Sequence, residues 1–86
     1  MKKYSIVFSK RAEKDILRLP ASAVERIIPE ITALEENPRP HGCKKLKGYD
    51  DLWRIRIGDY RVIYAIEDII LLVDIREVGN RKDVYK

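Results

Sequence analysis

The chain has 86 residues, a formal net charge of +4 at pH 7 and a single cysteine. Its length fits one domain, residues 1–86, and its 45% hydrophobic and 37% charged residues are typical of a soluble globule. One cysteine excludes an intramolecular disulfide, and one cysteine with one histidine gives no zinc-binding pattern. Because no apolar run is long enough for a membrane span or a signal peptide, we expect a cytoplasmic protein without membrane, metal or cofactor.

The N-terminal half predicts one strand and two helices. Residues 4–9 are β-branched and aromatic, which is typical of a strand. Residues 10–19 carry apolar side chains at helical spacing and stop before a proline. A second helix is expected to begin near Ser22, where Glu25 completes a capping box, and to kink at Pro29. Its expected apolar face comprises Val24, Ile27, Ile28, Ile31 and Leu34.

The C-terminal half predicts three strands. Residues 52–57 and 60–66 alternate between apolar and polar, and Gly58-Asp59 between them is a two-residue hairpin signal. Glu67-Asp68 indicates a second turn, and the apolar strand 69–75 follows it until a Gly-Asn pair ends it. The order strand, helix, helix and three strands predicts an α+β fold, in which two N-terminal helices pack on one face of a small antiparallel sheet.

The first hairpin predicts a cluster of arginines. With a two-residue loop, Arg56 pairs with Arg61, and alternation along the strands puts Arg54 on the same face. Like charges on paired strands cost ~0.2–1 kcal/mol, whereas guanidinium groups suit bidentate contacts to phosphate. This favours an anion site, although a solvated sheet face also carries arginines commonly.

The second hairpin extends this prediction. Carried through a two-residue turn, the register places Asp74 opposite Arg61, where it could orient that side chain. The same register puts Arg76 on the arginine face. The cluster therefore stays net positive.

Two basic segments flank the predicted hairpins. Three lysines around one leucine precede them and can follow a nucleic-acid backbone, although a solvated loop explains them as well: Lys44, Lys45 and Lys47. The C-terminal segment holds Arg81, Lys82 and Tyr85. A tyrosine beside several cations has a lowered pKa and can act as a general base, whereas packing near the chain end is the alternative for Tyr85.

Four segments together resemble the RelE family of toxins from toxin–antitoxin systems: residues 44–48, 52–57, 59–64 and 78–85. The pieces Arg-Val-Ile-Tyr and Arg-Lys-Asp-Val-Tyr, at this separation, carry most of the resemblance. It covers essentially the whole chain and implies the RelE-like β-α-α-β-β-β fold. It also implies a ribonuclease that enters the A site of the 70S ribosome and cuts mRNA there. In that reaction a 2′-hydroxyl attacks the adjacent phosphate, and no metal is needed.

The resemblance also implies residue roles. Arg54 and Arg56 correspond to basic residues that stabilise the reacting phosphate, and Arg61 corresponds to a phosphate-binding arginine. Arg81 corresponds to the residue that assists the leaving 5′-oxygen. Tyr85 corresponds to a tyrosine that acts as general base or as a stacking residue.

Two features depart from the family pattern. Arg54 and Arg56 stand where the best-known member has lysines. Because arginine does not lose its proton in proteins, a base role at position 56 is excluded, and proton abstraction falls to Tyr85 or to the ribosome and RNA. Asn80 stands where many relatives carry a basic residue, and asparagine gives no acid–base help.

Such toxins are held inactive by a small antitoxin, so the resemblance implies a RelB-like partner. Operator DNA is expected to be bound only through the toxin–antitoxin complex. Two alternatives stay open. One is a ParE-like inhibitor of DNA gyrase, and the other is a catalytically inactive homologue that acts only as an antitoxin-binding co-repressor. Arg61, Arg81 and Tyr85 as a set favour the ribonuclease.

Overall fold

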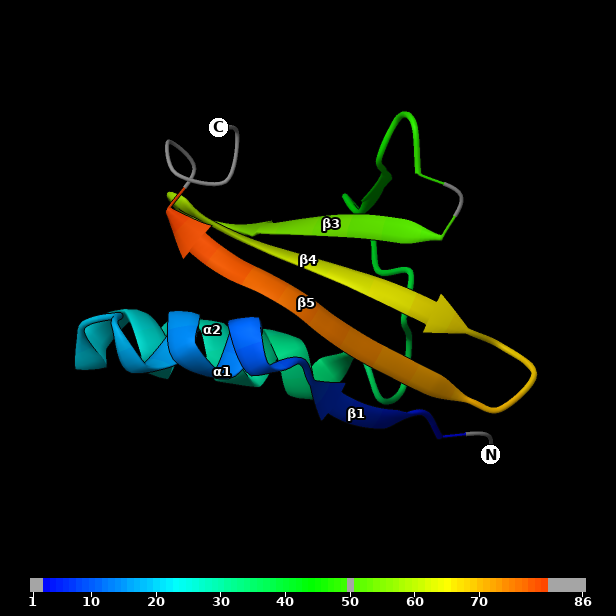
Figure 1. The fold of residues 1–86 in the computed structure, drawn as a ribbon, viewed down its shortest axis with the longest axis horizontal. Coiled ribbons are helices and arrows are strands. Elements are labelled where there is room, and N and C mark those ends of the chain that lie inside the picture. The colour runs from blue at the N-terminus through cyan, green and yellow to red at the C-terminus, as the bar shows by residue number, and fades with distance from the viewer. Residues whose placement is uncertain (1–2, 50, 81–86) are drawn as a thin grey trace.

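Two helices cover one face of a five-stranded sheet (Figure 1). The computed structural model describes residues 3–49 and 51–80. The elements in chain order are β1 (Ser5–Phe8), α1 (Lys10–Leu17), α2 (Ala21–Ala33), β2 (Lys44–Lys45), β3 (Leu52–Ile57), β4 (Tyr60–Glu67) and β5 (Leu72–Asn80). The strand order is β1-β5-β4-β3-β2, and all neighbours are antiparallel except β1 and β5. The predicted α+β architecture is confirmed, with β2 as an additional short strand.

The first helix begins where its sequence provides a cap. The Ser9 hydroxyl accepts a hydrogen bond from the backbone N–H of Ala12 at 3.1 Å, which satisfies one of the free donors of the first turn. The expected capping box of α2 is wrong. The helix begins at Ala21 with Pro20 as its N-cap, so Ser22 already lies inside the helix, and no side chain caps this end.

The apolar face of α2 is rotated slightly from the predicted one. Its buried members are Ala23, Ile27, Ile31 and, at the C-cap, Leu34. Ile28 is instead exposed and Val24 is half-buried, because the four buried residues already form a continuous stripe at helical spacing. Pro29 lies within the helix on its exposed side. No helix in the described part of the chain is both long and apolar enough to span a bilayer.

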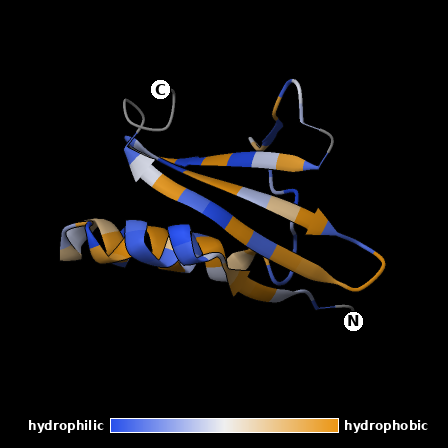
Figure 2. Ribbon diagram, in the orientation of Figure 1, coloured by the Kyte–Doolittle hydropathy of each residue, from blue (hydrophilic) through white to orange (hydrophobic). Residues whose placement is uncertain are grey.

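The register of the β3–β4 hairpin is as predicted. Arg56 lies opposite Arg61, and Arg54 lies opposite Ile63. Polar and apolar residues alternate along β3, whereas β4 is largely apolar from Val62 to Ile66 (Figure 2). In both strands the apolar side chains of one face join the core under the helices. The opposite face of the hairpin carries the arginines.

The predicted β4–β5 register is wrong. Four residues, Asp68–Leu71, form the turn. Leu71 has a positive φ of 53°, although the sequence has no glycine here to indicate such a conformation. Asp74 therefore lies opposite Ala65, and Arg61 lies opposite Gly79. The last strand also continues through the Gly-Asn pair that was expected to end it.

An irregularity in β5 changes which side chains face the arginines. The register shifts between Ile63 and Tyr64, whose partners are Glu77 and Ile75, so Arg76 is an extra residue on β5. Such a bulge interrupts the alternation of side chains. As a result, Arg76 and its neighbour Glu77 both border the same pocket on the arginine face, described below.

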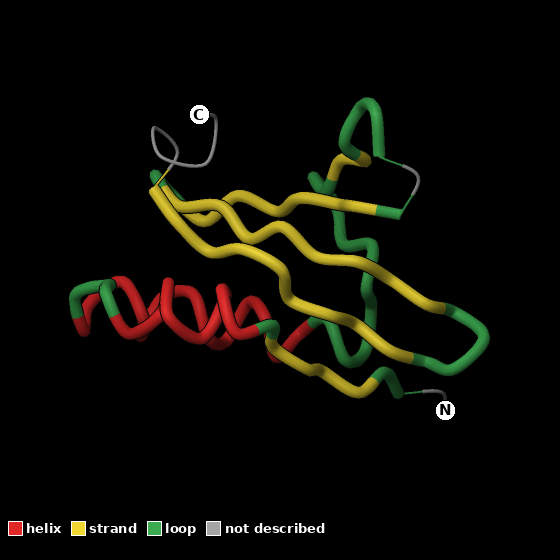
Figure 3. Tube along the Cα trace, in the orientation of Figure 1, coloured by secondary structure: helices red, strands yellow, loops and turns green. Residues whose placement is uncertain are grey.

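The loop after α2 crosses from the helix layer to the β2 edge of the sheet (Figure 3). The buried Tyr64 hydroxyl donates a hydrogen bond to the Pro38 carbonyl at 2.8 Å. Arg39 forms two hydrogen bonds with the Asp68 carboxylate, at 2.8 and 3.2 Å, and Tyr4 donates a third to that carboxylate at 2.6 Å. We call Tyr4, Arg39 and Asp68 the loop clamp.

Candidate functional site

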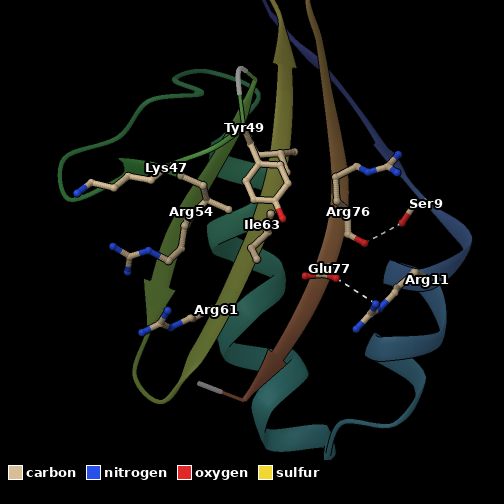
Figure 4. Close-up of a pocket in the computed structure, with 11 residues that line it drawn as sticks. Ser9, Arg11, Lys47, Tyr49, Arg54, Arg61, Ile63, Arg76 and Glu77 are labelled. Carbon is tan, nitrogen blue, oxygen red and sulfur yellow. Dashed lines mark hydrogen bonds and ion pairs between the residues drawn. The ribbon is translucent and has the colours of Figure 1, made fainter. Parts of the chain in front are cut away.

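A pocket of about 800 Å³ lies on the sheet face opposite the core (Figure 4). We call it the arginine pocket. Its charged lining consists of five basic side chains and one acidic one: Arg11, Lys47, Arg54, Arg61, Arg76 and Glu77. An apolar wall is formed by Leu46, Tyr49, Leu52 and Ile63.

Two arginines of this pocket are buried in the sheet. Arg54 is 5% exposed and Arg61 is 1% exposed, and these are the buried charged residues in the described part of the chain. A desolvated guanidinium acts in a medium of low dielectric constant, where its attraction for an anion is stronger than on an open surface. The pair is therefore suited to holding a phosphate rather than merely solubilising the sheet.

The side of the pocket near β5 is partly neutralised. Arg76 forms an ion pair with Asp74 at 2.9 Å, and Arg11 forms one with Glu77 at 3.1 Å. Arg11 also lies 3.8 Å from Asp15 on its own helix. The other basic residues of the pocket come from β3, β4 and the loop that carries Lys47 (Figure 4).

The structure brings together some of the predicted phosphate-binding residues. Arg54, Arg61, Arg76 and Lys47 all line the arginine pocket. Asp74 contacts Arg76 rather than lying opposite Arg61, which corrects the expectation that it orients Arg61.

Other predicted residues lie elsewhere. Arg56 is exposed, and although it pairs with Arg61 in register, it lines a separate cleft of about 260 Å³ that includes Glu30 of α2. Lys44 and Lys45 form β2 and are exposed. Three further predicted site residues lie outside the described part of the chain: Arg81, Lys82 and Tyr85.

The lining residues that were not predicted include Arg11, Tyr49 and Glu77. Arg11 reaches the pocket from α1 because that helix packs beside β5. Glu77 depends on the bulge at Arg76, which has no sequence signature. Tyr49 follows Gly48 in a loop, and this glycine was the sequence feature that could have indicated a turn presenting Tyr49. Among residues 3–49 and 51–80, no group of three or more His, Cys, Asp or Glu side chains is placed to hold a metal ion.

The sequence of residues 6–85 matches the family model of the ParE toxin of type II toxin–antitoxin system, parDE. Together with the fold, this match places the chain in the class of type II toxins. RelE1 of Methanocaldococcus jannaschii is 36% identical over 98% of this chain and 97% of that protein. The mRNA interferase toxin RelE of Escherichia coli K12 is 29% identical over 95% of this chain and 90% of that protein.

A solved structure gives the same result. The RelE–RelB complex from Pyrococcus horikoshii contains a chain that matches with a TM-score of 0.80 and 31% identity, over 94% of this chain and 97% of that chain. The present chain belongs to the RelE family of type II toxins.

Proposed function

We propose that this toxin is an endoribonuclease that cuts mRNA in the A site of the ribosome. The observation that carries the proposal is the arginine pocket, in which Arg54 and Arg61 are buried beside an apolar wall. The E. coli relative is named an mRNA interferase, which supports an RNA substrate. Its target places the proposed activity in the cytoplasm.

The proposed reaction is an intramolecular transesterification at one phosphate of the RNA. The 2′-oxygen of one nucleotide attacks its own 3′-phosphate, and the 5′-oxygen of the next nucleotide leaves. The products are a 2′,3′-cyclic phosphate and a 5′-hydroxyl end. The attacking hydroxyl gives up a proton and the leaving oxygen gains one, so the step is balanced without a cofactor or a metal.

Arginines contribute to this step through electrostatics. The phosphorane-like transition state carries more negative charge than the starting diester, so a fixed guanidinium stabilises it more than it stabilises the substrate. We assign this role to Arg61 and Arg54, with Arg56 as a further candidate. We assign stabilisation of the leaving 5′-oxygen to the Arg81 guanidinium, which keeps its own protons, and proton abstraction to Tyr85, as the family resemblance implies; the leaving oxygen then takes a proton from solvent.

We further propose a RelB-like antitoxin as the partner of this chain. The solved archaeal relative is a RelE–RelB complex, which supports this choice. Operator DNA would then be bound only through the antitoxin. An acidic segment of the antitoxin would oppose the five basic side chains that line the pocket.

The chemistry is tested by adding the purified toxin to a bacterial translation reaction with one defined mRNA. A parallel reaction omits the ribosomes. We expect new fragments only with ribosomes. At each cut the upstream fragment should end in a 2′,3′-cyclic phosphate, detectable by mass spectrometry, and the downstream fragment should begin with a 5′-hydroxyl. An upstream fragment that ends in a 3′-hydroxyl at the cut would contradict the proposed attack by the 2′-hydroxyl.

The matched family model is named for ParE toxins, so inhibition of DNA gyrase is the second candidate function. It predicts intact mRNA in the translation reaction and stabilised DNA cleavage in a gyrase assay with supercoiled plasmid. The ribonuclease proposal predicts the opposite result in both assays.

A further inference from the structure

The apolar wall of the arginine pocket ends in an exposed aromatic ring. Tyr49 is 58% exposed, although it lines the same pocket as the buried arginines. Next to it are the half-buried side chains of Leu46 and Leu52 and the buried Ile63. In Figure 4 the Tyr49 ring extends from its loop over the sheet toward Ile63. One of its faces is therefore available to a ligand in the pocket.

The loop that carries Tyr49 is closed at its base. The backbone N–H of Leu46 donates to the carbonyl of Leu52 at 2.9 Å, which continues the pairing of β2 with β3 by one step. Gly48 has a φ of +83°, a conformation that L side chains rarely adopt, and it turns the chain directly before Tyr49. The position of Tyr49 at the pocket is thus set by the backbone.

We propose that Tyr49 is a stacking platform for one nucleobase of the bound RNA, adjacent to the phosphate held by Arg54 and Arg61. This inference rests on the proposed function and names the part of the substrate that the apolar wall receives. A nucleotide is a flat, weakly polar ring joined to an anion. The pocket offers the matching pair of surfaces, an aromatic and aliphatic wall and a cluster of guanidinium groups.

Stacking gives the exposed tyrosine a role beside arginines that bind anions. Arginines alone bind any polyanion, whereas an aromatic face adds affinity only for a ligand that has a base. Every base has a π-face, so the platform favours nucleic acids over polyanions that have no bases, without reading a codon.

The test measures binding without cleavage. A 2′-O-methyl trinucleotide cannot be cut, because the attacking hydroxyl is blocked, and an abasic trinucleotide keeps the backbone without bases. Isothermal titration at low salt gives the Kd of each for the unaltered toxin and for Tyr49→Ala, Tyr49→Phe and Arg61→Ala. Circular dichroism verifies that each variant is folded.

We expect Tyr49→Ala to weaken the base-containing ligand by roughly 5- to 150-fold, the range for loss of one stacked base. Binding of the abasic ligand should be unchanged, and Tyr49→Phe should bind both ligands like the unaltered toxin. Arg61→Ala should weaken both ligands, because it removes a contact to the backbone.

Three results would overturn the stacking platform: equal loss of both ligands in Tyr49→Ala, no loss of either, or no binding of the base-containing ligand by the unaltered toxin. Cleavage of mRNA in the translation reaction is scored separately. Cleavage of mRNA without base-dependent binding would contradict only the proposed role of Tyr49. Base-dependent binding without cleavage would support the role of Tyr49 and contradict the proposed ribonuclease activity.

Discussion

Tyr64 joins two layers of the molecule through one hydroxyl group. Its side chain is fully buried in the core, and its hydroxyl donates to the carbonyl of Pro38, which is also buried. Burial raises the pKa of the Tyr64 hydroxyl, so the group stays protonated and remains a donor. Removal of the Tyr64 hydroxyl leaves the buried Pro38 carbonyl without this hydrogen bond.

Tyr64→Phe is therefore expected to lower the free energy of unfolding by about 1–3 kcal/mol, the cost of leaving a buried acceptor without its donor. Urea denaturation followed by circular dichroism measures the change. Tyr49→Phe removes the same atom from an exposed side chain and should change stability by less than about 0.5 kcal/mol. Equal effects of the two substitutions would show that the Tyr64 bond contributes no more than a surface hydroxyl.

Tyr85 lies outside the described residues, so its role stays a prediction from the family resemblance. If Tyr85 takes the proton from the 2′-hydroxyl, Tyr85→Phe should slow cleavage by about 10²–10⁴-fold, the usual contribution of a general base. We expect that loss, because arginine at position 56 does not serve as a base. Single-turnover rates against pH measure it. A small loss with an unchanged pH profile would assign Tyr85 to stacking instead.

At the scale of elements, short-range turn chemistry decided which registers could be predicted. Gly58 supplies the positive φ of 60° that a two-residue hairpin needs, so the pairing of β3 with β4 followed from the sequence. In the next turn Leu71 adopts a positive φ without being glycine, and the four-residue loop was missed. The parallel pairing of β1 with β5 joins opposite ends of the chain and has no local signal.

The loop clamp fastens the segment after α2 to the β4–β5 turn. Hydrogen bonds from Arg39 and then from Tyr4 hold the pKa of Asp68 at about 2, below its usual value of 3.8. Arg39 also lies 5.0 Å from the centre of the Trp53 ring, a cation–π distance. The folded protein therefore stabilises the ionised form of Asp68.

Because the pKa of Asp68 is lower in the folded protein, its stabilisation is present above pH 3.8 and is lost as the pH falls toward about 2. We expect Asp68→Asn to have a lower Tm than the unaltered toxin at neutral pH. The difference should shrink between pH 4 and pH 2. Thermal melts across this range measure it, with the exposed Asp51→Asn as control. A Tm difference that is independent of pH would show that the clamp does not depend on the charge of Asp68.

At the scale of the whole molecule, a small core must support an open, positively charged sheet face. Ile27 on α2 is completely buried, whereas its neighbour Ile28 is 36% exposed. Ile27→Ala should lower the free energy of unfolding by about 2–5 kcal/mol, a large share of the roughly 5–15 kcal/mol typical of a domain. Ile28→Ala should cost about 1 kcal/mol or less. Urea denaturation of both variants compares them, and equal losses would contradict the observed orientation of α2.

The candidate site could be predicted in part: one hairpin placed Arg54 and Arg61 together, and Lys47 and Arg76 were also predicted as phosphate-binding residues. Basic residues are spread through the whole sequence, and the fold gathers five of them around one pocket. Arg54 and Arg61 were predicted to share a face because their hairpin is local. Arg11, Tyr49 and Glu77 were not predicted, because a helix contact, a loop position and a bulge bring them to the pocket.

The central claim is that the buried arginines make this toxin a ribonuclease on the ribosome. Its most direct test maps new 5′ ends by primer extension in a translation reaction, with the unaltered toxin, Arg61→Ala and Lys14→Ala side by side. Lys14 is an exposed lysine of α1, so its removal changes the net charge equally without altering the pocket. We predict codon-phased cuts by the unaltered toxin and by Lys14→Ala, and a rate about 10²–10³-fold lower for Arg61→Ala, the cost of removing one preorganised donor. Full activity of a folded Arg61→Ala protein would contradict the claim.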